Sequence, residues 1–149
     1  MLGALGGEVV LDLFAGTGAL GIESLSRGAE RAVFVERDAG AVRVLRENLS
    51  TLGLSPPVGE VRQIDALAAL RSALAEQETY DLIFIDPPYS QAHDWAGELS
   101  VSLPALMRPR ARVVVESDRR APLRLELGVQ RERRYGDTSI TIHRIEHET

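Results

Sequence analysis

The chain has 149 residues, of which 44% are hydrophobic, and a formal net charge of −5. This length suits one domain around one core, so we expect a single domain over residues 1–149. The absence of cysteine excludes a disulfide framework and a thiolate metal site. No apolar run approaches the roughly 20 residues of a membrane helix, and the first residues carry no positive charge before Glu8, unlike a signal peptide. We therefore expect a cytoplasmic protein with no metal and no membrane partner.

The charges are distributed unevenly along the chain. All 17 basic residues are arginine, and nine of them lie between Arg108 and Arg134 with only four acidic residues. This segment has a net charge of +5, which leaves −10 for the rest of the chain. One interpretation is a codon bias combined with a solvated face. The other is a local surface that binds phosphate, for which guanidinium groups are well suited.

Apolar runs alternate with helical patterns from the start of the chain. We predict strands at Glu8–Phe14, Arg31–Glu36, Val58–Ile64, Tyr80–Asp86 and Arg112–Glu116. We predict helices at Ala19–Arg27, Ala39–Leu52, Ala66–Glu76 and Asp94–Met107, with Asp38 as an N-cap and Pro104 breaking the last helix near its end.

Two further strand patterns, Val129–Tyr135 and Ser139–Ile145, flank Gly136-Asp137, which is a hairpin signal. Alternating strands and helices predict a parallel sheet with helices on its faces. The expected fold class is therefore α/β and Rossmann-like, a mainly parallel sheet with a C-terminal antiparallel hairpin.

The first motif, Asp12-Leu13-Phe14-Ala15-Gly16-Thr17-Gly18, ends the first strand and opens a helix. Glycines there let backbone N–H groups approach a ligand, and the Asp12 carboxylate could hold an ammonium group. Glu36 ends the second strand, where a carboxylate can accept both ribose hydroxyls of a nucleoside. The same glycines also match the dinucleotide pattern of a nicotinamide dehydrogenase, and they could merely close a tight turn.

The third motif, Asp86-Pro87-Pro88-Tyr89, follows the fourth strand at the carboxyl edge of the sheet, where ligands of open α/β sheets bind. Asp86 and the Pro87 carbonyl can together accept hydrogen bonds from an NH₂ group, and Tyr89 can stack on a base. A dehydrogenase has no use for this set. The alternative for the tetrapeptide alone is a Pro-Pro turn covered by an aromatic ring.

Together these segments resemble the class I amino-methyltransferases with a D/N-P-P-Y/F motif. The runs Leu11–Glu23, Leu25–Ala29, Phe34–Glu36, Asp81–Tyr89 and Tyr135–Thr138 resemble more specifically the RsmD family of 16S ribosomal RNA (guanine-N2)-methyltransferases. Members of that family usually carry a basic N-terminal arm that this sequence lacks, which would supply RNA contacts and part of the cofactor-site lid.

The resemblance implies S-adenosylmethionine as cofactor and no metal. It implies that Asp86, Pro87 and Tyr89 are catalytic. The cofactor residues that it implies are Asp12, Ala15, Gly16, Thr17 and Gly18 at the methionine end, Glu36 at the ribose, and Arg37, Asp65 and Ala66 at the adenine. Two of these have a structural alternative: Asp65 could serve as the N-cap of the next helix, and Arg37 could be an exposed, solvated side chain.

The function that follows is methylation of a guanine N2 amine in 16S ribosomal RNA, in the small subunit or its assembly intermediate, by a monomer. Within the class, the alternative is a DNA adenine-N6 or cytosine-N4 methyltransferase, although the chain has no room for a separate target-recognition domain. A protein-glutamine methyltransferase ranks lower because it usually has Asn at the position of Asp86. A non-catalytic cofactor-binding factor for ribosome assembly is the alternative from another class.

Overall fold

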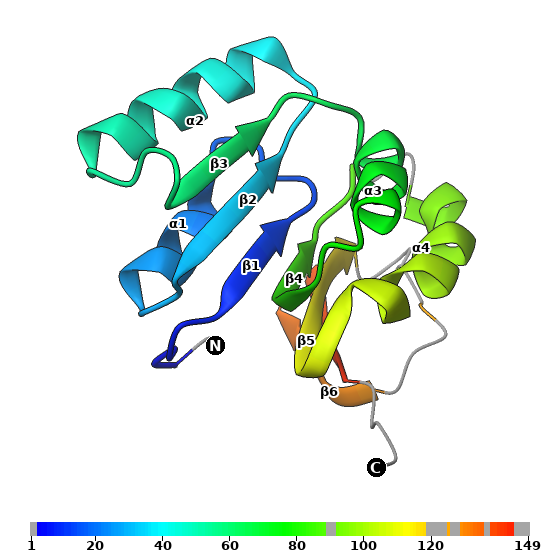
Figure 1. Cartoon of the computed structure of the whole chain (residues 1–149). Helices are drawn as coiled ribbons and strands as arrows, with labels where there is room; N and C mark the ends of the chain where they lie inside the picture. The colour runs from blue at the N-terminus through cyan, green and yellow to red at the C-terminus, as the bar shows by residue number, and fades with distance from the viewer. Residues whose placement is uncertain (1–2, 89–91, 119–124, 126–128, 136–137, 145–149) are drawn as a thin grey trace. The chain divides into compact units, whose positions relative to one another are not determined.

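A computed structural model describes the backbone of residues 3–88, 92–118, 125, 129–135 and 138–144, and the side chains of residues 3–88, 96–116, 125 and 140–144. The chain divides into two compact units, Met1–Ser72 and Ala73–Thr149, which are described one after the other (Figure 1). The single domain expected from the chain length stays a prediction.

The first unit contains three parallel strands in the order β3-β2-β1. Its elements are β1 (Val9–Asp12), α1 (Ala19–Ser26), β2 (Arg31–Val35), α2 (Ala39–Thr51) and β3 (Gly59–Arg62). Helix α1 packs on β1 and β2, and α2 packs on β3. The residues Ala32–Val35 of β2 are all at most 1% exposed. A continuous apolar run of this kind is typical of a parallel strand covered on both faces.

Helix α2 shows how the sequence pattern determines local structure in this unit. The side chain of Asp38 accepts a hydrogen bond of 2.8 Å from the backbone N–H of Ala41, which confirms the predicted N-cap. The apolar residues Val42, Leu45 and Leu49 recur at helical spacing and are at most 2% exposed. Leu52, which continues that spacing, is 57% exposed because it caps the helix, beyond its last turn.

The second unit has four strands in the order β4-β5-β7-β6. Its elements are β4 (Tyr80–Ile85), α4 (Ala92–Leu106), β5 (Met107–Asp118), β6 (Val129–Tyr135) and β7 (Thr138–Arg144), preceded by α3 (Ala66–Ala75), which begins in the first unit. Strands β4 and β5 are parallel, whereas β7 pairs antiparallel with both β5 and β6. The expected parallel strands followed by an antiparallel hairpin are therefore confirmed.

Two boundaries around α4 differ from the sequence prediction. The helix continues past Pro104 to Leu106, so the proline lies inside its last turn and does not end it. Strand β5 then begins at Met107, five residues before the predicted start at Arg112. The segment 107–111 has no strand pattern, but Met107 pairs with Tyr80 of β4, and this tertiary pairing extends the strand. In the part of the chain that the structure describes, no helix is both long and apolar enough to cross a membrane.

Close packing of α1 on β2 requires a glycine in the helix. A Cβ atom at Gly21 would overlap Cε1 of Phe34 and lie 2.8 Å from its Cζ. The Phe34 ring is fully buried and has little room to move away. Gly21 therefore sets how closely α1 approaches the strands that carry the Gly-rich turn.

We predict that Gly21→Ala lowers the free energy of unfolding by about 1–2 kcal/mol, because the overlap with Phe34 outweighs the better helix propensity of alanine. The matched control is Gly97→Ala in α4, where a Cβ atom meets nothing within 4 Å. That change should raise the free energy of unfolding by about 0.5–1 kcal/mol. Urea unfolding followed by circular dichroism measures both, and an equal shift in the same direction would contradict the role of Gly21.

Candidate functional site

The first part of the site is the turn that joins β1 to α1. The backbone N–H of Ala15 donates to the Val35 carbonyl at 2.9 Å, which ties the turn to the end of β2. Gly16 and Gly18 have φ angles of 57° and 96°, in the left-handed region that favours glycine. The N–H of Gly18 donates to the Ala15 carbonyl and closes the turn.

The space around the two glycines differs. A Cβ atom at Gly18 would overlap Leu45 and approach Ile22, so this glycine permits close packing inside the unit. A Cβ atom at Gly16 would meet nothing within 4 Å, so the turn is open above this residue. The first turn of α1 has no side-chain cap on its backbone N–H groups. An open glycine beside an uncapped helix start fits an anionic ligand group.

Glu36, which follows β2, holds the turn in place through both carboxylate oxygens. Its Oε1 accepts a hydrogen bond of 2.9 Å from the N–H of Gly16, and its Oε2 accepts one of 2.8 Å from the N–H of Asp38. Each carboxylate oxygen has a further acceptor position. Glu36 can therefore organise the turn and still accept hydroxyl groups from a ligand.

Asn48 of α2 also supports the turn, and sequence analysis missed it. Its Nδ2 donates to the Thr17 carbonyl at 3.2 Å, although the two residues are 31 positions apart. No local pattern marks Asn48, because a partly exposed polar position of an amphipathic helix has the same sequence pattern whether or not its side chain reaches a distant carbonyl.

The remaining predicted cofactor residues lie in the same unit. Asp12 is the last residue of β1 and is 2% exposed, so its carboxylate is held inside the protein beside the turn. Asp65 accepts from the N–H of Ala68 at 3.4 Å, which confirms its predicted role as an N-cap, here of α3; its adenine contact stays a prediction. Ala15 and Ala66 are buried, whereas Thr17 and Arg37 are exposed.

A second group of predicted site residues follows β4 in the second unit. Asp86 is exposed at the surface, yet nearby protein atoms partly desolvate its carboxyl and raise the pKa from 3.8 to about 6. Repulsion from the Glu116 carboxylate adds to the shift. Because Ile85, the last residue of β4, pairs with Val115 of β5, Asp86 directly after β4 lies beside Glu116 of β5. Sequence analysis missed Glu116, although two acids at the ends of neighbouring parallel strands are a usable signal.

Pro87 is buried and Pro88 is exposed, so the segment after Asp86 has one proline packed inward and one at the surface. Tyr89, predicted to stack on a base, lies outside the described residues. Within the described part of the chain, no group of three or more His, Asp or Glu side chains could hold a metal ion.

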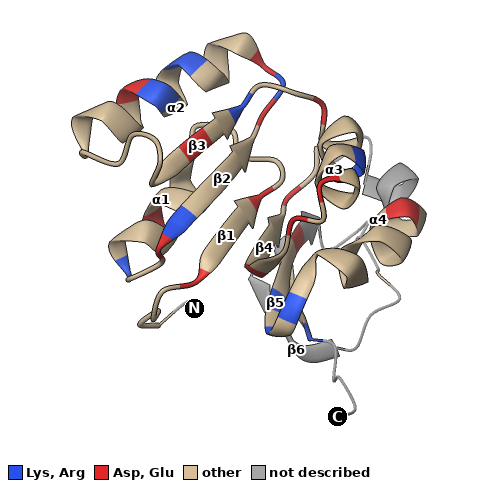
Figure 2. Cartoon of the chain, viewed as in Figure 1, with Lys and Arg blue, Asp and Glu red and all other residues tan. Residues whose placement is uncertain are grey.

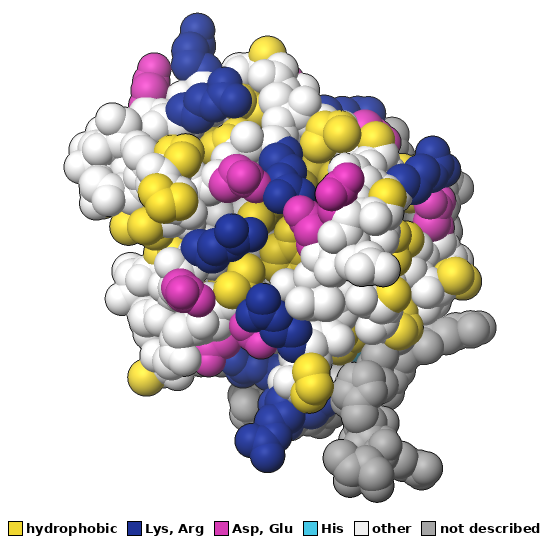
Figure 3. Space-filling model, in the orientation of Figure 1, with side chains coloured by type: hydrophobic (Ala, Val, Ile, Leu, Met, Phe, Trp, Pro, Cys, Tyr) yellow, Lys and Arg dark blue, Asp and Glu magenta, His cyan; other side chains and the backbone are white. Residues whose placement is uncertain are grey.

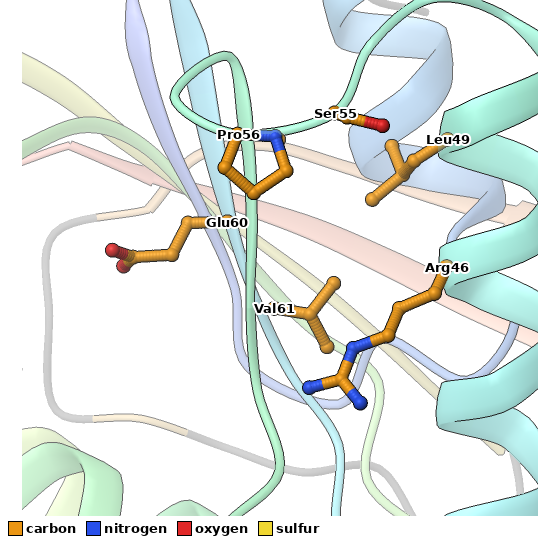
Figure 4. Close-up of a pocket in the computed structure, with 7 residues that line it drawn as sticks. Arg46, Leu49, Ser55, Pro56, Glu60 and Val61 are labelled. Atoms are coloured by element: carbon orange, nitrogen blue, oxygen red, sulfur yellow. The ribbon is translucent and has the colours of Figure 1, made fainter.

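A separate cavity of about 300 Å³ lies in the first unit between α2 and β3 (Figure 4). Arg46 and Leu49 come from the helix, Ser55 and Pro56 from the loop before β3, and Val61 from the strand. The cavity lies near the start of β3, whereas Asp65 follows the end of that strand. None of the predicted site residues lines it.

Comparison with solved structures defines the class of protein. An Escherichia coli protein, yhhF, named provisionally as a methyltransferase, aligns with a TM-score of 0.76 and 27% identity over 96% of this chain and 78% of that chain. The chain has the class I, Rossmann-like fold of S-adenosylmethionine-dependent methyltransferases.

Sequence comparison then defines the family. A family model described as Conserved hypothetical protein 95 matches residues 1–144, and the chain belongs to this family, the RsmD family. A Bacillus subtilis protein, YlbH, named provisionally as an rRNA methyltransferase, is 36% identical over 90% of this chain and 74% of its own length. Ribosomal RNA small subunit methyltransferase D of Haemophilus influenzae is 36% identical over 76% of this chain, which spans 58% of that relative's length.

The repulsion between the Glu116 and Asp86 carboxylates predicts a measurable change in the pKa of Asp86 when Glu116 is replaced. We expect Glu116→Gln to lower the pKa of Asp86 from about 6 towards 3.8, because it removes the repulsion and leaves desolvation in place. Carbon-13 NMR titration of the side-chain carboxyls measures the change. Glu98→Gln in α4 is the control and should leave the pKa of Asp86 unchanged. An unchanged Asp86 pKa in Glu116→Gln would show that the two groups do not interact.

Proposed function

We propose that this protein transfers a methyl group from S-adenosylmethionine to the exocyclic N2 amine of a guanine in 16S ribosomal RNA. The observation that carries the proposal is the acid-Pro-Pro segment directly after β4, with an Asp86 carboxylate whose pKa is raised to about 6. At neutral pH this group is still mostly ionised, so it can accept hydrogen bonds. It is also a better proton acceptor than an unperturbed aspartate.

The residues of the first unit fit the cofactor. The open turn at Gly16 and the uncapped start of α1 suit the methionine carboxylate, and the buried Asp12 carboxylate suits its ammonium group. The free acceptor positions of Glu36 suit the two ribose hydroxyls. When bound, S-adenosylmethionine supplies an electrophilic methyl group on its sulfonium sulfur.

Asp86 and the carbonyl of Pro87 would act on the acceptor amine. The lone pair of a guanine N2 is delocalised into the ring, which makes the nitrogen a poor nucleophile. Hydrogen bonds from its NH₂ group to Asp86 and the Pro87 carbonyl favour a pyramidal nitrogen with its lone pair directed out of the ring plane. Once the nitrogen is methylated and cationic, its proton passes to Asp86 or to water. Orientation and placed dipoles of this kind each contribute several kcal/mol in favourable cases.

The choice of RNA as substrate rests on the names of the relatives and on the charge of the chain. Both curated relatives are named for ribosomal RNA, and one of them for the small subunit. The segment from Arg108 to Arg134 carries a net charge of +5 in an otherwise acidic chain. A target base must leave its stack, which costs least in an RNA loop, and stacking on Tyr89 would offset about 1–3 kcal/mol of that cost.

In this role the protein would work in the cytoplasm, as a monomer and as one methyltransferase domain, on an assembling small subunit. Faster transfer to an assembling subunit than to naked 16S RNA supports this substrate. Transfer to DNA in preference to either would favour the amino-methyltransferases of DNA.

We predict that Asp86→Ala lowers methyl transfer by about 10²–10³-fold, because the amine loses the acceptor that orients it. Affinity for S-adenosylmethionine should stay within about tenfold, or less than about 1.4 kcal/mol. Transfer of tritiated methyl groups to small subunits measures the first quantity, and calorimetry measures the second. A loss of cofactor affinity by orders of magnitude would mean that Asp86 mainly holds the cofactor.

We also predict that the wild-type chain binds S-adenosylmethionine and S-adenosylhomocysteine but not NAD. Glu36→Ala should weaken both adenosyl ligands by about 100-fold, because two hydrogen bonds to a charged acceptor are lost and the turn at Gly16 is released. Glu47→Ala on the exposed part of α2 is the control. Isothermal titration calorimetry with all three ligands measures the effect, and tight binding of NAD would instead support a dehydrogenase.

A further inference from the structure

Four arginines of the second unit gather where β5 begins and β7 ends. Arg108, Arg110 and Arg112 occupy alternate positions of β5, and Arg144 is the last residue of β7. Figure 2 shows basic residues in blue at the start of β5, and Figure 3 shows arginine side chains on the surface of the same region. Arg110 is exposed, and the other three are partly exposed. We call these four residues the arginine cluster.

Within the cluster, two arginines lie opposite each other on adjacent strands. Arg112 of β5 is the direct partner of Arg144 in the antiparallel pairing of β5 with β7. Like charges directly opposite each other on adjacent strands destabilise a sheet. The neighbour of Arg112 on its other side is Leu82 of β4, which supplies no counter-charge. The pair therefore destabilises the fold locally, and an anion bound between the guanidinium groups would remove this destabilisation.

The hydrogen bonding of the cluster is incomplete among the described residues. Arg108 donates to Asp81 at 2.9 Å and to Thr79 at 3.1 Å. No ion pair joins Arg110, Arg112 or Arg144 to an acid within the described side chains. The Nε of Arg144 is buried and has no hydrogen-bond partner there. A buried guanidinium donor of this kind costs free energy unless a ligand accepts from it.

An irregularity in the pairing of β4 with β5 lies within the cluster. Between the pairs Tyr80–Met107 and Leu82–Arg112, β4 advances by two residues while β5 advances by five. The extra residues include Pro109, which has no N–H for the ladder, and Arg110, whose φ is 67°. A non-glycine residue in the left-handed region is uncommon, and bulges often redirect side chains at functional positions.

From these observations we propose that the arginine cluster binds a phosphate group of the RNA backbone, and this rests on the proposed function. Guanidinium groups offer paired donors that match phosphate geometry. The cluster lies at the opposite end of β5 from Glu116. Arg112 and Glu116 are four positions apart on β5, about 13 Å at roughly 3.3 Å per strand residue. The bound phosphate therefore belongs to a nucleotide other than the one whose base Asp86 holds.

The proposal is tested by the salt dependence of RNA binding. The probe is fluorescein-labelled 16S ribosomal RNA, and anisotropy is measured between about 50 and 200 mM salt. Arg112→Gln and Arg144→Gln should each weaken binding by about tenfold, and each should lower the slope of log affinity against log salt by about 0.7. Arg112→Lys should keep the slope, because it keeps the charge. Arg43→Gln, an exposed arginine of α2 in the first unit, is the matched control and should change neither quantity.

A thermal unfolding measurement separates a binding role from a structural one. Because each Gln variant removes a like-charge contact, Tm in the absence of RNA should stay constant or rise. A fall of several degrees in both Gln variants, with RNA binding unchanged, would assign the pair to folding and overturn the proposal. The wild type could also gain Tm in millimolar inorganic phosphate while the salt slope of RNA binding does not depend on these arginines. That result would indicate a site for free phosphate and would also overturn the proposal.

The outcomes for this cluster and for the proposed function can be told apart. If the protein methylates small subunits but the Gln variants bind RNA with wild-type affinity and slope, the enzyme function stands and the arginine cluster is not an RNA site. If the slope depends on the arginines but no RNA accepts a methyl group, the phosphate site stands and the proposed reaction fails.

Discussion

The two hydrogen bonds that the Glu36 carboxylate accepts are the interaction on which the candidate cofactor site depends. One comes from Gly16 in the turn after β1, and the other from Asp38 at the start of α2. A single side chain thus joins the ends of two parallel strands and the beginning of a helix. Because Gly16 has a left-handed backbone that few other residues adopt, this anchor also keeps an open surface at the turn. Asn48 supports the same turn from α2 through the Thr17 carbonyl.

Basic and acidic residues lie towards opposite ends of strand β5. Glu116 near its carboxyl end adds to the desolvation that raises the pKa of Asp86, whereas Arg108, Arg110 and Arg112 lie at its beginning. The acidic end suits an uncharged amine that must later lose a proton, and the basic end suits a phosphate. A nucleic-acid substrate carries both groups on one chain, so one strand can present the two complementary surfaces although the whole protein is acidic.

Much of the fold could be predicted because local signals and tertiary packing agree. The alternation of apolar runs with helical spacing predicted every described strand and helix, and Asp38 was recognised as an N-cap because capping is a contact within one turn. Predictions failed where a distant partner determined the outcome. The segment 107–111 lacks a strand pattern and joins β5 only because Met107 meets Tyr80, and Leu52 keeps the helical spacing but lies beyond the packed turn.

The sequence by itself determined the order of elements, the Gly-rich turn, the acid at the end of β2 and the acid-Pro-Pro segment after β4, since each is a pattern of neighbouring residues. Only the tertiary structure decided that Glu116 opposes Asp86, that Asn48 holds the Thr17 carbonyl, and that Arg112 faces Arg144. These contacts join residues that are far apart in the chain. The contacts between strands depend on strand register, whereas the contact of Asn48 depends on the position of α2 beside the turn. A shift of register by one residue would turn each side chain to the other face of the sheet, and no local pattern specifies register across separate elements.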